Sequence, residues 1–77
     1  MPPKLGVFSG AEVCRIMERN GFVKIRQRGS YCVMQTTSFD SGTTTVPVPM
    51  HREIRLGTLM AIIRQSGLPR ELFELKN

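Results

Sequence analysis

Four residues, Lys24, Arg26, Arg28 and Tyr31, have the types and the spacing of a nucleic-acid-binding surface. The pair Gly29-Ser30 lies between two runs of strand-forming residues and predicts a tight hairpin turn. Because side chains alternate between the two faces of a strand, the three cations and the aromatic ring would then project from one face. Cations contact phosphates and an aromatic ring stacks on bases, so this face is predicted to bind RNA. The alternative is an ordinary solvated strand face.

The turn position also sets the predicted register of the two strands. The predicted cross-strand pairs are Arg28 with Tyr31, Arg26 with Val33 and Lys24 with Gln35. The opposite, apolar face would then consist of Val23, Ile25, Cys32 and Met34. Ser30 is interpreted as a turn residue, and the alternative is a donor of a hydrogen bond to an RNA phosphate.

The remaining candidates for chemistry are one histidine and two cysteines. His51 could act as an acid or base, since histidine titrates near neutral pH, or it could hold a structural hydrogen bond. Cys14 and Cys32 lack the C-x-x-C or Cys/His spacing of a zinc site. They are interpreted as small buried hydrophobic residues, and neither a metal nor another cofactor is expected.

The first element that would support this hairpin is a helix. Ser9 and Glu12 have the spacing of a capping box, which predicts the start of the helix. Val13, Ile16 and Met17 then follow at helical spacing, and Asn20-Gly21 predicts the end of the helix.

After the hairpin, the chain is predicted to form one further strand and two helices. A β-branched run predicts the strand over 43–48, and Pro47 and Pro49 indicate that this strand is either an edge strand or ends there. A helix is predicted over 56–66, and a short last helix is predicted to begin at Pro69. The order predicts an α+β fold, α-β-β-β-α(α), with helices on one face of a three-stranded antiparallel sheet. The double-stranded-RNA-binding domain has this order of elements.

Size and charge fit one small basic domain. The 77 residues carry 11 Lys and Arg against 6 Asp and Glu, a net charge of +5, so residues 1–77 are predicted to form a single RNA-binding domain. The sequence pI of about 10.0 agrees with a nucleic-acid partner. No apolar run is long enough to span a membrane, and no signal peptide is recognised, so a cytoplasmic location is expected.

Longer blocks of the chain resemble the HicA toxins of bacterial type II toxin–antitoxin systems. The blocks are Asn20-Gly21-Phe22, Arg26-Gln27-Arg28-Gly29-Ser30, Thr45-Val46-Pro47-Val48-Pro49-Met50-His51, Glu53-Ile54-Arg55-Leu56-Gly57-Thr58-Leu59 and Ile62-Ile63-Arg64-Gln65-Ser66-Gly67-Leu68. Their order and spacing extend the resemblance over nearly the whole chain. It implies a fold similar to the double-stranded-RNA-binding domain and metal-independent cleavage of messenger RNA. It also implies a HicB-type antitoxin that covers the active surface.

The chain departs from the family pattern at Tyr31. In the family the catalytic histidine follows the Gly-Ser of the hairpin, and the resemblance places Tyr31 at that position. A histidine exchanges protons near neutral pH because its ordinary pKa is about 6.5, whereas a tyrosine phenol titrates near about 10. Tyr31 and, as the alternative, His51 are therefore the catalytic candidates. We expect reduced cleavage with RNA binding retained.

Three functions consequently fit the sequence. The first is a HicA-type endoribonuclease toxin, as the resemblance implies. The second is a relative that binds RNA or an antitoxin but has lost efficient cleavage, which Tyr31 favours. The third is a basic scaffold that binds a protein and no RNA, because basicity alone also fits an acidic protein partner.

Overall fold

The computed structural model describes residues 3–75, and the first element in it is helix α1 (Gly10–Arg19). Ser9 caps this helix as predicted. The Ser9 hydroxyl accepts a hydrogen bond from the Glu12 backbone N–H, and the Glu12 carboxylate accepts one from the Ser9 backbone N–H. Asn20 is the C-cap of the helix, and the following Gly21 has a positive φ of 94°, a conformation that glycine adopts without steric cost.

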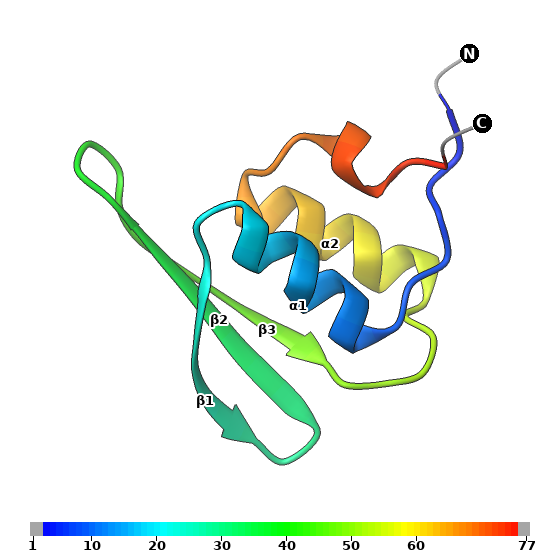
Figure 1. Cartoon of the computed structure of the whole chain (residues 1–77), viewed down its shortest axis with the longest axis horizontal. Coiled ribbons are helices and arrows are strands. Elements are labelled where there is room, and N and C mark those ends of the chain that lie inside the picture. Colours follow the sequence, from blue (N-terminus) through cyan, green and yellow to red (C-terminus); the bar gives the residue numbers. More distant parts are fainter. Residues whose placement is uncertain (1–2, 76–77) are drawn as a thin grey trace.

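The central element is a sheet of three antiparallel strands in the order β1-β2-β3. The strands are β1 (Val23–Arg28), β2 (Tyr31–Ser38) and β3 (Gly42–Pro49). β3 is an edge strand and ends at Pro49, so both alternatives drawn from its two prolines describe it. Figure 1 shows that the β2–β3 hairpin extends well beyond the helices, and the exposed Phe39 lies in its turn.

Two helical segments follow the sheet. α2 (Leu56–Ser66) has the predicted bounds and ends at Gly67, whose φ is 71°. The predicted last helix is a single 3₁₀ turn, η1 (Arg70–Phe73). Figure 1 shows the beginning of the described chain beside its end, and there Leu5 forms a β-bridge with Glu74.

The core lies between the helices and one face of the sheet. α1 contributes Val13 and Met17, which are fully buried, and α2 contributes Leu59 and Ile62. The sheet contributes side chains from one face of β2 and β3, namely Cys32, Met34, Val46 and Val48. The helices and this face therefore share one core, as the predicted α+β layout requires. None of the helices in residues 3–75 is long and apolar enough to cross a membrane.

The predicted register of the first hairpin is correct near the turn and wrong farther away. Arg28 pairs with Tyr31 and Arg26 with Val33, but an irregularity of the β-bulge type between Lys24 and Arg26 shifts the pairing. Lys24 therefore pairs with Met34 rather than Gln35. Since paired residues share a face and Met34 is buried, Lys24 lies on the helix side of the sheet, away from Arg26 and Arg28.

The predicted apolar face of the hairpin is also partly wrong, because the bulge shifts the residues of β1. Cys32 and Met34 are buried as expected, but Val23 and Ile25 are 60% and 41% exposed. The bulge moves Val23 to the face opposite the core, where it pairs with Gln35. Every residue of β1 is exposed, because β1 is the other edge of the sheet and α1 covers it only in part.

Candidate nucleic-acid interface

The face of the sheet opposite the core, here called the open face, carries a shallow basic hollow. Its volume is about 510 Å³, and it is lined by Arg26, Arg28, Tyr31, Val33, Thr45 and Pro47. The strand pairing explains this set, because Arg28 pairs with Tyr31, Arg26 with Val33, and Val33 with Pro47. Two guanidinium groups thus lie beside an aromatic ring over an apolar floor.

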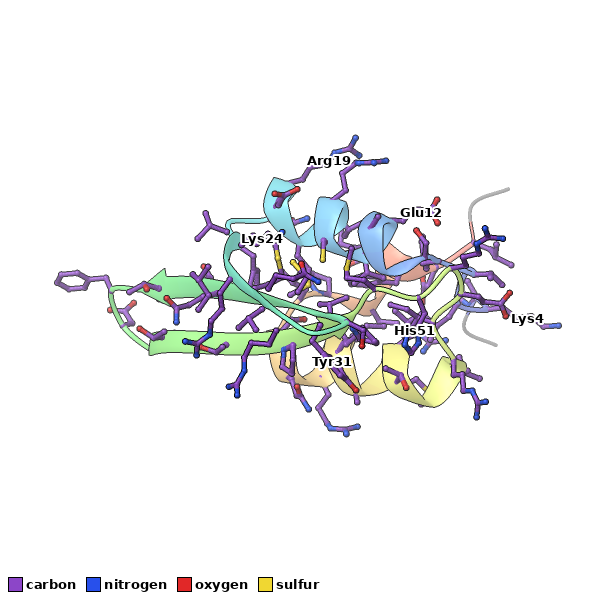
Figure 2. All side chains as sticks on the ribbon, turned by 90° about the horizontal axis from the view of Figure 1, so that it is seen from below. Lys4, Glu12, Arg19, Lys24, Tyr31 and His51 are labelled. Carbon is purple, nitrogen blue, oxygen red and sulfur yellow. The ribbon has the colours of Figure 1, made fainter. Side chains whose placement is uncertain are left out.

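A second hollow, here called the cleft, lies between the open face and α2. Its volume is about 400 Å³, and its lining combines Tyr31, Pro47 and Pro49 from the sheet with residues of α2 and its approach, namely His51, Glu53, Ile54, Arg55, Thr58, Ala61, Ile62 and Gln65. Tyr31 and Pro47 line both hollows, so the cleft and the basic hollow adjoin. Figure 2 shows Tyr31 and His51 near α2, and Lys24 near α1.

Backbone hydrogen bonds hold the segments that carry Tyr31 and His51 beside the cleft. The Ser30 carbonyl accepts a hydrogen bond of 2.7 Å from the Met50 N–H, which joins the hairpin turn to the end of β3. The His51 carbonyl accepts one of 2.9 Å from the Gly10 N–H. The segment that carries His51 is therefore attached both to the turn before Tyr31 and to the first residue of α1.

Gly10 permits this attachment because it has no side chain. A Cβ at residue 10 would overlap the carbonyl oxygen of Pro49 and lie 2.8 Å from the Met50 Cα. Backbone atoms cannot move away as a flexible side chain can, so the approach of α1 to the end of β3 requires glycine here. The sequence contained no signal for this contact.

The chemistry available in the cleft is that of proton exchange and anion binding. Tyr31 is 46% exposed and its phenol can donate a hydrogen bond, and the exposed His51 offers ring nitrogens that can donate or accept one. The sequence had suggested no role for Glu53, which also lines the cleft and supplies a carboxylate, and Arg55, another lining residue, adds a guanidinium group. The sequence feature that could have identified Glu53 is its closeness to His51, since both lie in the segment that lines the cleft.

The other predicted site residues are placed differently. Ser30 is an exposed residue of the turn, and its carbonyl oxygen accepts the hydrogen bond from the Met50 N–H. A hydrogen bond from the Ser30 hydroxyl to an RNA phosphate stays a prediction. Lys24 lies on the opposite face and does not line either hollow. The basic part of the candidate interface therefore consists of Arg26 and Arg28, with Arg55 across the cleft.

The two cysteines are part of the core. Cys14 and Cys32 are free and buried, as the sequence predicted. Burial, with a smaller effect from the neighbouring Cys32, raises the pKa of the Cys14 thiol to about 12, so this thiol stays protonated at neutral pH. Within residues 3–75 no three His, Cys, Asp or Glu side chains lie close enough together to hold a metal ion.

Comparison with known proteins identifies the family. A family model described as "HicA toxin of bacterial toxin-antitoxin" matches residues 10–68, from the start of α1 to just beyond α2. The matched residues contain the whole sheet and all residues that line the cleft. A search of the curated proteins finds no match for the chain. Since the family match covers well over half of the 77 residues, the chain belongs to the HicA toxin family of bacterial toxin–antitoxin systems.

Proposed function

We propose that this HicA-family chain is a cytoplasmic toxin that binds messenger RNA on the open face and in the cleft, and cleaves it slowly. The observation that carries the proposal is the junction of the two hollows at Tyr31. The basic hollow offers Arg26 and Arg28 for phosphates, and the cleft offers Tyr31 and His51 for proton transfer. An RNA strand that spans both hollows would bring its backbone to groups able to act on it.

Cleavage without a metal requires two proton transfers. A base takes the proton of the ribose 2′-hydroxyl, whose oxygen attacks the adjacent phosphorus, and an acid gives a proton to the leaving 5′-oxygen. Guanidinium groups such as those of Arg28 and Arg55 would stabilise the charge that develops on the phosphate. The phenol of Tyr31 can donate a hydrogen bond to a phosphate oxygen, and it can stack on a base.

The rate is proposed to be low because Tyr31 occupies the position where the family carries its catalytic histidine. A phenol accepts a proton poorly at neutral pH, since tyrosine ordinarily titrates near about 10. RNA binding does not depend on that proton, so binding persists. This distinction separates the proposal from a fully active nuclease.

The proposed regulation is neutralisation by a HicB-type antitoxin. The open face is basic and the whole chain has a net charge of +5, so without a cover it would attract cellular RNA indiscriminately. We propose that the antitoxin presents an acidic surface to Arg26 and Arg28 and blocks access of RNA to Tyr31.

A cleavage assay on a defined RNA tests the proposal. Tyr31→His should raise the cleavage rate and the growth toxicity, with a pH dependence centred near the ordinary imidazole pKa. Tyr31→Ala should change the already low rate little, because the phenol is not the proton acceptor.

Two results would contradict this assignment. Rapid cleavage by the unmodified chain that His51→Ala abolishes would make His51 the catalytic group. Rapid cleavage that Tyr31→Phe abolishes, while His51→Ala retains it, would make the phenol itself catalytic.

A further inference from the structure

The cleft is built differently from the basic hollow beside it. Its walls include Pro47 of β3 and Ala61 of α2, which offer apolar surface to the flat faces of a ring. Its polar lining combines the hydrogen-bonding groups of Glu53, Thr58 and Gln65 with the guanidinium group of Arg55. Its volume of about 400 Å³ falls within the range of about 300–1,000 Å³ found for small-molecule sites.

The shared residues connect the cleft to a strand held on the open face. Tyr31 and Pro47 line both hollows, so a strand whose phosphates lie near Arg26 and Arg28 passes the mouth of the cleft. One base can then turn past the half-exposed ring of Tyr31 into the cleft. Recognition of such splayed bases by stacking and by hydrogen bonds to their edges is the usual way in which proteins bind single-stranded RNA.

The polar groups of the cleft set which base fits. The Glu53 carboxylate, when ionised, only accepts hydrogen bonds, so it matches an exocyclic amine and opposes a carbonyl oxygen. Adenine N6 and cytosine N4 are such amines, whereas uracil carries a carbonyl oxygen at the corresponding position. The Gln65 amide can accept from the amine and donate to the neighbouring ring nitrogen, as glutamine does with adenine.

We infer that the cleft is a base-recognition subsite that selects adenine or cytosine over uracil through Glu53 and Gln65. The inference rests on the RNA binding proposed above and names the specificity of that same site. Glu53 and Gln65 act here as specificity-determining residues, and neither needs to take part in cleavage.

Binding of short oligonucleotides tests the subsite. The probes are fluorescein-labelled 2′-O-methyl hexanucleotides of adenine, cytosine or uracil, which cannot be cleaved by attack of a 2′-hydroxyl, and the readout is fluorescence anisotropy at fixed salt. The unmodified chain should bind the adenine and cytosine oligomers at least about fivefold more tightly than the uracil oligomer, as expected for one good base contact.

Two variants assign the selectivity to residues. Glu53→Gln replaces an acceptor by a group that can donate to a carbonyl, so the preference over uracil should fall at least about threefold. Gln65→Ala should weaken adenine and cytosine binding more than uracil binding. Glu18→Gln is the matched control, because it removes the same charge from the exposed surface of α1, outside the cleft, and should leave the preference unchanged.

The outcomes separate the subsite from the proposed function. Equal affinity for the three oligomers, or a preference that neither Glu53→Gln nor Gln65→Ala alters, would contradict base selection in the cleft. The proposed RNA binding would not be affected by either result. Absence of binding to every oligomer, with the fold intact by circular dichroism, would overturn the proposed function and the subsite with it.

Discussion

The backbone N–H of Gly10, the first residue of α1, donates a hydrogen bond of 2.9 Å to the carbonyl oxygen of His51. The contact attaches α1 to the segment that lines the cleft, and it exists because residue 10 has no Cβ. Gly10→Ala should therefore displace the backbone of Pro49 and Met50 and lower the free energy of unfolding by about 1–3 kcal/mol or more. Thermal unfolding followed by circular dichroism measures this loss.

Gly57→Ala provides the matched control for that substitution. Gly57 lies in the first turn of α2, and apart from its chain neighbours and the nearby backbone of the same helix no atom comes within 4 Å of a Cβ placed there. Alanine has a higher helix propensity than glycine, so the free energy of unfolding of this variant should rise by up to about 1 kcal/mol. If both variants lost stability equally, the contact between Gly10 and Pro49 would not be the reason for the loss.

The capping box of α1 predicts a pH dependence of stability. Hydrogen bonds from the Ser9 backbone N–H and, to a smaller extent, the Ser9 side chain lower the pKa of Glu12 below its usual 4.5. A lowered pKa means that the stabilising contribution is fully present above the usual value and is lost as pH falls through the lowered one. Glu12→Gln should therefore flatten the acid side of the stability curve.

Ser9→Ala tests the other half of the same box. It removes the hydroxyl that accepts a hydrogen bond from the Glu12 N–H, and it should lower the free energy of unfolding by about 1 kcal/mol at neutral pH. Urea unfolding at several pH values measures both variants. Stability curves that remain parallel to that of the unmodified chain at acid pH would contradict the role assigned to Glu12.

Most of the fold could be predicted because local signals determine it. Ser9 with Glu12 predicted the start of α1, and the apolar spacing before Gly67 predicted the bounds of α2. The two small residues of the turn predicted the pairing of Arg28 with Tyr31 and of Arg26 with Val33. Each of these features depends on residues close together in the sequence.

The errors arose where distant segments decide the structure. Nothing in the β1 sequence marks the bulge between Lys24 and Arg26, which is seen only in the pairing of β1 with β2. The cleft was missed for the same reason, since Gln65 reaches it only through the packing of α2 beside β3. The roles of Tyr31 and His51 stay predictions, although both residues line one cleft.

Neutralisation by an antitoxin predicts competition for the open face. A purified HicB-type partner should displace RNA from the chain, and its association rate should rise as the salt concentration falls, because opposite charges steer the encounter. Stopped-flow fluorescence with labelled partner measures the rate. A stable complex that holds RNA and antitoxin on Arg26 and Arg28 together would contradict simple occlusion.

The central claim is that RNA binds the open face, and the opposite sides of the sheet on which Arg26 and Lys24 lie allow a direct test. RNA affinity measured against salt concentration should fall steeply for the unmodified chain, with a slope that decreases by about 0.7 for each phosphate contact removed. Arg26→Ala with Arg28→Ala should weaken binding and reduce the slope, whereas Lys24→Ala should change both much less. If Lys24→Ala weakened binding as much as the double variant did, or if the double variant bound RNA normally, the open face would not be the RNA-binding surface.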